Sequence, residues 1–249
     1  MKRENPKMKN TLRIDLETTG KRPGCCILTI GAAGIDKNGL EVNFYARIHH
    51  DKSKDEGFDD DPETLDWWRK QDTATLKEAF AGTTEGPQDV VNEFVDFVNK
   101  NFDTSAKDFT VWSKGSDFDF PILKAYLDAY DLATPWPFWS QRDYRTLQAV
   151  FPFIKKAESN VEKHNALEDA LAQMRGLMHF MSLEAVFKEK PQNMINQPPV
   201  SKQRNVGMNC WWCRRTKQCN EYRLKYMRGF VPLCKNCAEG FRTKIKEQK

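Results

Sequence analysis

Two carboxylates lie one residue apart inside an apolar stretch near the start of the chain, Ile14-Asp15-Leu16-Glu17. The stretch has the pattern of a β-strand, in which alternate side chains share a face, so Asp15 and Glu17 are expected to point the same way. Two like charges side by side repel each other unless a cation lies between them, and Mg²⁺ or Mn²⁺ prefers such oxygen ligands. The pair therefore indicates a metal-binding strand or, alternatively, the solvated face of an edge strand.

The hydrophobic pattern of the first 188 residues predicts an α/β fold, a mixed sheet flanked by helices. Strands are predicted at residues 11–16, 25–35, 40–49 and 109–112. Helices are predicted at residues 62–70, 88–101, 121–130 and 165–187. The first three strands should form an antiparallel meander, with Asn38-Gly39 as a hairpin turn. Residues 51–61 have the composition of an acidic loop, and Asp61 is a plausible cap for a helix that starts at Pro62.

Charge and composition divide the chain into three parts. The last 49 residues contain 13 Lys and Arg against 3 Asp and Glu, a net charge of +10, which leaves −6 for residues 1–200. A Pro-rich polar segment lies between the acidic first part and the basic last part of the chain. The predicted division is therefore a domain at 8–188, a linker at 189–207 and a basic module at 208–249. The basic module suggests a polyanionic partner, although a merely solvated tail is the alternative. No apolar run has the length of a membrane span, and we expect a cytoplasmic protein.

Five of the seven cysteines cluster in the basic module. Cys210 and Cys213 form one C-x-x-C pair and Cys234 and Cys237 another, with 20 residues between the pairs. Four thiolates at this spacing predict one structural Zn²⁺ in a reducing compartment, and a redox pair is the less favoured alternative. Cys219 is a spare that could replace one ligand. The spacing resembles that of zinc-ribbon or treble-clef fingers, and the surrounding Arg, Lys, Trp and Tyr favour contact with nucleic acid over contact with protein.

Two later segments combine acids with a predicted helix start. In the first, residues 112–123, Asp117 and Asp119 stand where a strand passes into a helix. In the second, residues 164–170, His164 precedes Asp169 by five residues, so the histidine can lie on the loop before the helix with the aspartate near it. Each could be only a helix cap when taken alone. Together with Asp15 they predict one acidic site built from three distant segments.

Three motifs, Asp15-x-Glu17, Phe118-Asp119 and His164-x₄-Asp169, resemble those of the DnaQ-like exonucleases, in the subgroup called DEDDh for its four acids and histidine. The resemblance covers roughly residues 8–188 and is strongest to small phage and prophage 3′–5′ exonucleases. It is supported by further matching segments: Asp66-Trp67-Trp68, Trp112-x-x-Gly115, Pro135-Trp136-x-Phe138-Trp139 and Arg142-Asp143-x-Arg145-Thr146. It implies a ribonuclease H-like fold, and it favours Asp119 over the nearby Asp117.

The resemblance also implies the chemistry. Asp15 would bridge two Mg²⁺ or Mn²⁺ ions, Glu17 and Asp169 would complete one site, Asp119 would serve the other, and His164 would be the general base. The substrate would be single-stranded DNA or RNA, released as nucleoside 5′-monophosphates. Candidate substrate contacts are Thr18, Trp112, Lys114, Phe118 and Arg145, with Trp67 and Trp68 as stacking or core residues. The alternatives are an inactive nucleic-acid-binding adaptor and a hydrolase of short oligonucleotides or signalling dinucleotides.

Overall fold

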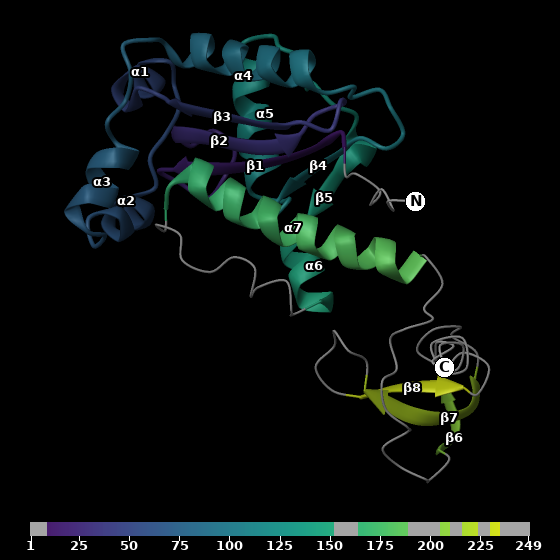
Figure 1. Cartoon of the computed structure of the whole chain (residues 1–249). Helices are drawn as coiled ribbons and strands as arrows, with labels where there is room; N and C mark the ends of the chain where they lie inside the picture. Colours follow the sequence, from purple (N-terminus) through teal and green to yellow (C-terminus); the bar gives the residue numbers. More distant parts are fainter. Residues whose placement is uncertain (1–8, 152–163, 189–204, 210–215, 224–229, 235–249) are drawn as a thin grey trace. The chain divides into compact units, whose positions relative to one another are not determined.

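The computed structural model describes residues 9–151, 164–188, 205–209, 216–223 and 230–234 (Figure 1). The chain forms two compact units: the first ends at His179 and contains a five-stranded sheet, and the second begins at Phe180 and contains a three-stranded sheet. The predicted domain and linker boundaries stay predictions. Within the described ranges, every helix is too short or too polar to span a lipid bilayer.

The five-stranded sheet is mixed, with the strand order β3-β2-β1-β4-β5. Its strands are β1 (Thr11–Thr18), β2 (Ile27–Ile35), β3 (Glu41–Arg47), β4 (Thr110–Ser113) and β5 (Gln141–Asp143). The first three strands pair antiparallel, while β4 runs parallel to β1 and β5 parallel to β4. The predicted meander and the predicted mixed sheet are therefore confirmed.

The four predicted helices are present, with ends that shift by a few residues. They are α2 (Pro62–Trp68), α4 (Pro87–Asn101), α5 (Asp119–Ala129) and α7 (Ala166–Lys188). Asp61 caps α2 as expected, because its carboxylate accepts a hydrogen bond from the backbone N of Glu63 at 2.9 Å. Proline occupies the first turn of this helix, where its missing N–H costs no hydrogen bond.

Several short elements were not predicted. They are α1 (His50–Asp55), α3 (Thr73–Ala79), the 3₁₀ helix η1 (Phe138–Ser140), strand β5 and α6 (Tyr144–Val150). The prediction of a loop over residues 51–61 was wrong for its first half, because α1 has no apolar periodicity and its side chains are mostly polar. Such short helices depend on tertiary contacts rather than on propensity. In α1 these are the buried Ser53 and a cap in which the His49 ring accepts from Lys52 N.

A carboxylate network ties α1 to the loop before α2. One oxygen of Asp60 lies 2.8 Å from His50 Nε2, and the other lies 3.0 Å from Lys54 Nζ. Burial opposes the charge, but hydrogen bonds from His50, Thr19 and Lys54 outweigh it and lower the pKa of Asp60 to about 2. The neighbouring Cys26 is buried in the core, and burial raises the pKa of its thiol to about 12. This network completes its charge balance within the protein.

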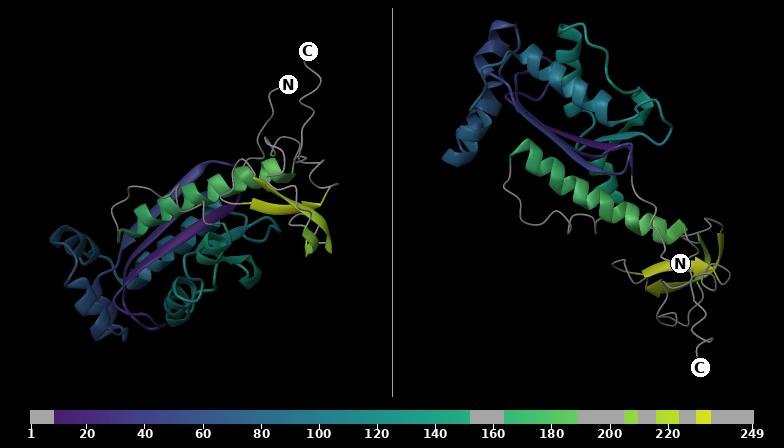
Figure 2. Two further views of the ribbon diagram at one scale, coloured as in Figure 1. Left: turned by 90° about the horizontal axis from the view of Figure 1, so that it is seen from below. Right: turned by 45° about the horizontal axis from the view of Figure 1, so that its top comes forward.

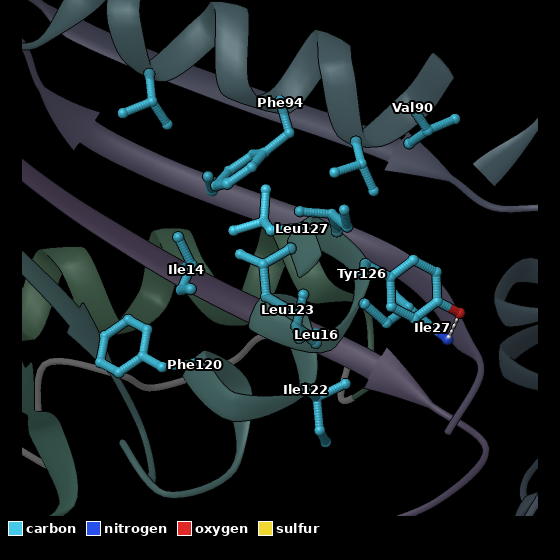
Figure 3. Close-up of a cluster of buried hydrophobic side chains, with 14 of the residues drawn as sticks. Ile14, Leu16, Ile27, Val90, Phe94, Phe120, Ile122, Leu123, Tyr126 and Leu127 are labelled. Atoms are coloured by element: carbon cyan, nitrogen blue, oxygen red, sulfur yellow. Dashed lines mark hydrogen bonds between the residues drawn. The ribbon is translucent and has the colours of Figure 1, made fainter. Parts of the chain in front are cut away.

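Helices α4 and α5 cover one face of the sheet (Figure 1). Their apolar side chains meet those of β1 and β2 in one core, shown in Figure 3 by Ile14, Leu16, Val90, Phe94, Leu123 and Tyr126 among others. The Tyr126 hydroxyl accepts a hydrogen bond from Ile27 N at 2.8 Å, which satisfies a backbone donor at the start of β2. Ile14 and Leu16 thus occupy the core side of β1, which leaves the opposite face of this strand for Asp15 and Glu17.

Helix α7 crosses the opposite face of the sheet, as both views in Figure 2 show. Its first residues lie directly on β2 at Gly31: a Cβ built on this glycine would be 2.1 Å from the carbonyl carbon of Ala166. Real side chains do not come so close, so only glycine allows this approach. Gly31 is also the cross-strand partner of Asp15. The absent side chain on β2 therefore brings the start of α7 next to the acidic strand.

The second unit contains an antiparallel sheet in the order β6-β7-β8, formed by β6 (Asn205–Asn209), β7 (Thr216–Arg223) and β8 (Phe230–Cys234). Cys234 is the last residue of β8, and its Cα partner on β7 is Cys219. The other predicted zinc ligands, Cys210, Cys213 and Cys237, lie outside the described residues, as do most of the basic and aromatic residues between them. The zinc site stays a prediction.

Candidate active site

The acidic face of β1 opens onto a cavity of about 920 Å³. Its walls come from the end of β1, the turn between β4 and α5, the start of α6 and the first turns of α7. Its lining includes the predicted residues Asp15, Glu17, Lys114, Phe118, Asp119, Arg145, His164 and Asp169. The fold thus gathers all five predicted catalytic residues around one space.

Three of these acids form a tight group. Carboxylate oxygens of Asp15, Glu17 and Asp169 all lie within 4.8 Å of one another, with Asp169 contributed by the first turn of α7. Burial raises the pKa of Glu17 to about 9, and repulsion from Asp15 and Asp169 adds to the shift. Burial likewise raises the pKa of Asp15. Hard oxygen ligands with uncompensated negative charge fit a divalent cation such as Mg²⁺ or Mn²⁺.

Asp119 enters the cavity from the start of α5. Its side chain is buried, and its Oδ1 accepts a hydrogen bond from Leu16 N at 3.2 Å. Burial raises the pKa of Asp119, while the nearby Arg13 opposes the shift. Asp117, the other acid of this turn, lines the same cavity but is exposed to solvent. The two neighbouring acids are therefore held in opposite environments.

A buried arginine lies beneath the acids. Arg13 is fully buried, and its Nη2 lies 3.3 Å from Asp15 Oδ1 and bonds the side-chain oxygen of Gln173. Its Nη1 donates to the carbonyls of Ile14 at 2.6 Å and Trp112 at 2.8 Å. Gln173 Nε2 also donates to Asp15 Oδ1, at 3.1 Å. Together these contacts hold one oxygen of Asp15 and bring a permanent positive charge to the acidic face.

Neither Arg13 nor Gln173 was predicted as a site residue, although the sequence carries a signal for each. Arg13 precedes Asp15 by two residues and therefore shares its face of the strand. Gln173 follows Asp169 by four residues and therefore shares its face of α7. Lys21, which also lines the cavity, was missed as well, and its position after Gly20 carries no comparable pattern.

His164 is held just before α7 in an unusual backbone conformation. Its φ is +68°, and its backbone N donates to Asp169 Oδ2 at 3.2 Å. Its imidazole meets the ring of Trp67 edge to face, with centroids 4.8 Å apart, and the ring of Trp68 lies 6.4 Å away. Trp68 is buried, and its indole N donates to Thr18 O at 2.8 Å. The two tryptophans thus connect the histidine to the end of β1.

The candidate substrate contacts divide into two groups. Lys114, Phe118 and Arg145 line the cavity. Thr18 and Trp112 do not: the Thr18 hydroxyl donates to Gly20 O at 2.7 Å within the buried end of β1, and the Trp112 indole donates to Thr110 Oγ1 at 3.1 Å. Neither side chain lines the cavity, because each makes its hydrogen bond to a neighbouring residue of its own segment.

A glycine supports the basic wall of the cavity. Gly115 has a φ of +118°, which side chains other than glycine rarely adopt, and it lies against the guanidinium of Arg145. Arg145 Nη2 in turn donates to the Lys114 carbonyl at 3.2 Å. Asp143 joins the two segments, since its Oδ1 accepts from the backbone N of both Gly115 and Arg145. The position of the Arg145 cation is thus fixed by backbone contacts.

Comparison with known proteins gives one match to a family model. Residues 10–181 match the 3′-5′ exoribonuclease Rv2179c-like domain, and no curated protein matches the chain.

Solved structures that resemble this chain include cell-death related nuclease 4 (CRN-4) and the nuclease domain of 3′hExo, a DEDDh family member, bound to rAMP. Each is 10% identical to this chain, with TM-scores of 0.48 and 0.45 over 71% and 72% of it. The matched regions are 66% and 92% of those two chains. Both similarities are distant, and neither bears on what this chain does.

Proposed function

This chain belongs to the family of Rv2179c-like 3′-5′ exoribonuclease domains, and we propose that it removes nucleotides one by one from the 3′ ends of single-stranded RNA or DNA. The products would be nucleoside 5′-monophosphates. The proposal depends on one observation: four acids and a histidine from three distant segments line a single cavity beside cationic side chains. RNA is the first substrate to test, because the family description names it.

Asp15, Glu17 and Asp169 would hold a divalent cation, and Asp119, which lines the same cavity, would serve a second. When bound, such cations lower the pKa of water and neutralise charge on the phosphate. The contribution of the protein is to hold the acids close together despite their repulsion. Arg13 and Gln173 do this by fixing one oxygen of Asp15, which leaves its other oxygen for the cavity.

His164 would accept the proton of the attacking water on a ring nitrogen, the usual role of a histidine that acts as a general base. The positive φ of this residue and the edge of Trp67 restrain where the ring can lie. Lys114 and Arg145 would bind phosphate oxygens of the substrate end. Phe118, at the same wall, offers a face for the terminal base.

Digestion of 5′-labelled single-stranded RNA and DNA of equal sequence, with Mg²⁺ or Mn²⁺, tests the proposal. We expect a ladder that shortens from the 3′ end, absent in Asp15→Asn and Asp119→Asn. Asp117→Asn is the matched control, since Asp117 belongs to the same turn as Asp119 but is exposed. A folded, metal-loaded protein that degrades only short oligonucleotides, or neither polymer, would contradict the proposal and favour a small-substrate hydrolase or a binding protein.

For the second unit we propose one structural Zn²⁺ bound by Cys210, Cys213, Cys234 and Cys237, and contact of its basic residues with nucleic acid. Thiolate ligands persist in a reducing compartment, so we also propose a cytoplasmic location for the chain. Zinc analysis of the full chain and of Cys234→Ser tests the first point. Removal of all residues after Lys188 tests the second: it should reduce activity on long strands and leave short substrates unaffected.

A further inference from the structure

Two aromatic side chains stand out from the surface without a role in the cavity. Phe138 and Trp139 are 80% and 64% exposed, and they are the largest strongly exposed apolar side chains among the described residues. They form η1, between α5 and β5, and their rings meet edge to face at 5.2 Å. Burial of such surfaces is favourable, so an exposed aromatic pair often marks a binding surface.

The turn that presents the pair is held firmly at both ends. Before it, Trp136 is buried, with its ring edge against Phe94 and Phe120 of the core. After it, Ser140 is buried, and both its backbone N and its hydroxyl donate to Pro137 O, at 3.0 and 2.7 Å. The two aromatic residues therefore project from a fixed turn rather than from a loose loop, and the fold itself keeps them out of the core.

The turn leads directly to the wall of the cavity. From η1 the chain enters β5, the edge strand of the sheet, and β5 ends at Asp143, which fixes Arg145 in the cavity wall. Arg145 is the sixth residue after Trp139, so the two Cα atoms are at most about 22 Å apart even in a fully extended chain. That is the length of a few nucleotides.

Positive charge accompanies this path. Arg142 is exposed, and its guanidinium is anchored beside the aromatic pair because Nη1 donates to Trp139 O at 2.6 Å and Gln141 O at 2.8 Å. The acid of the segment, Asp143, is occupied by the backbone N–H groups of Gly115 and Arg145. The aromatic faces suit the bases of a single strand, and the arginines that follow them toward the acidic cavity suit its phosphates.

We propose that Phe138 and Trp139 are a stacking platform for unpaired bases of the substrate strand, a few nucleotides upstream of the 3′ end in the cavity, with Arg142 on the intervening backbone. The proposal rests on the proposed function and adds to it a second contact region that short substrates cannot reach. Stacking on aromatic rings is tolerant of sequence, so the platform would extend the bound length without selecting bases.

Substrate length gives the first test. For Phe138→Ala/Trp139→Ala we expect kcat/KM on a single strand of about 20 nucleotides to fall by about 10- to 100-fold, while kcat/KM on a dinucleotide stays unchanged. Leu40→Ala is the matched control: Leu40 is also 64% exposed, but it precedes β3 at the opposite edge of the sheet. An equal loss on both substrates, or no loss on either, would overturn the proposal.

Crosslinking gives a second test that does not need turnover. In Asp15→Asn, 5-iodouridine placed at successive positions from the 3′ end should crosslink to Phe138 or Trp139 at one internal position and not at the terminal one. Crosslinks that never reach η1, or a change in oligomeric state of the double variant with an unchanged length dependence, would overturn the platform. If the wild type cleaves neither substrate, the exonuclease proposal fails, whereas cleavage with an unaltered length ratio in the double variant refutes the platform alone.

Discussion

Two groups of charged residues differ in how their charge is balanced: Asp60 with His50 and Lys54, and the acids of the cavity. Asp60 receives hydrogen bonds from His50, Thr19 and Lys54, and its pKa falls to about 2. The acids of the cavity face one another over a single buried arginine, and burial with mutual repulsion raises the pKa of Glu17 to about 9. The first group is complete within the protein and stabilises it. The second is incomplete within the protein and can gain its balance from a bound proton or a bound cation, as expected of a functional site.

The largest effect that separates the two groups is expected for Asp15→Asn. It removes the central acid of the cavity, so turnover should fall by about 10⁴-fold or more. This is a larger loss of turnover than removal of one hydrogen-bond donor to a transition state causes. The melting temperature of the metal-free protein should nevertheless stay equal or rise, because repulsion is relieved. Turnover and thermal unfolding in chelator measure both quantities. A marked loss of metal-free stability would mean that the acids of the cavity are as satisfied as Asp60.

His164→Ala should reduce turnover by about 10²–10⁴-fold, the range of a lost general base. Metal binding, followed by calorimetry with Mg²⁺ or Mn²⁺, should be retained, because the three grouped acids are unchanged. His164→Gln, which keeps a polar side chain of similar length but no basic nitrogen, is the control and should be equally slow. Loss of metal binding in either variant would assign His164 to the metal site instead.

The two groups should give opposite dependences of stability on pH. The raised pKa of Glu17 means that the folded, metal-free protein binds a proton that the unfolded chain releases, so this contribution falls as pH rises from about 4.5 to about 9. The lowered pKa of Asp60 gives a contribution that is present above about 4 and lost as pH falls toward about 2. Urea unfolding in chelator across pH measures both slopes. Glu17→Gln should flatten the fall in stability that Glu17 causes as pH rises from about 4.5 to about 9, and excess Mg²⁺ should also reduce this fall. If the fall is unchanged in Glu17→Gln, the assignment to Glu17 is contradicted.

The smallest effect is expected for Asp60→Asn. It weakens the hydrogen bonds of His50 and Lys54 and should lower the free energy of unfolding by about 1–3 kcal/mol, with turnover per folded molecule little changed. Asp59→Asn is the matched control, since the side chain of the adjacent Asp59 is exposed and forms a surface ion pair with Arg22. If both variants unfold with the same free energy as the wild type, the Asp60 network does not stabilise the fold.

The sequence predicted those parts of the fold that have a repeating pattern. Period-two alternation around Asp15 placed both acids on one face of β1, and helical spacing located α4 and α7 to within a residue or two. Three-residue β5 has no room for a pattern and exists because β4 offers it a partner. Helix α1 lacks an apolar stripe, so its residues were interpreted as a loop.

For the site, the sequence predicted which residues take part but not how the fold places them. The acids and His164 could be named from motifs, but their separation of up to 154 residues along the chain hides which face of which element each one uses. Thr18 was predicted to contact substrate, although it directly follows Glu17 and the next residue of a strand points to the other face. Arg13, in contrast, was within reach of the same rule.

Gly31 has a consequence for how this protein can vary. It touches none of the cavity residues through a side chain, and it carries no charge, proton or ligand atom. Yet a single added methyl group would collide with the backbone of Ala166 and push the start of α7, with its histidine and aspartate, off the sheet. In a saturation mutagenesis screen for activity, position 31 should therefore be as intolerant as the acids themselves, and a graft of this centre onto another scaffold must copy an empty space along with the reactive groups.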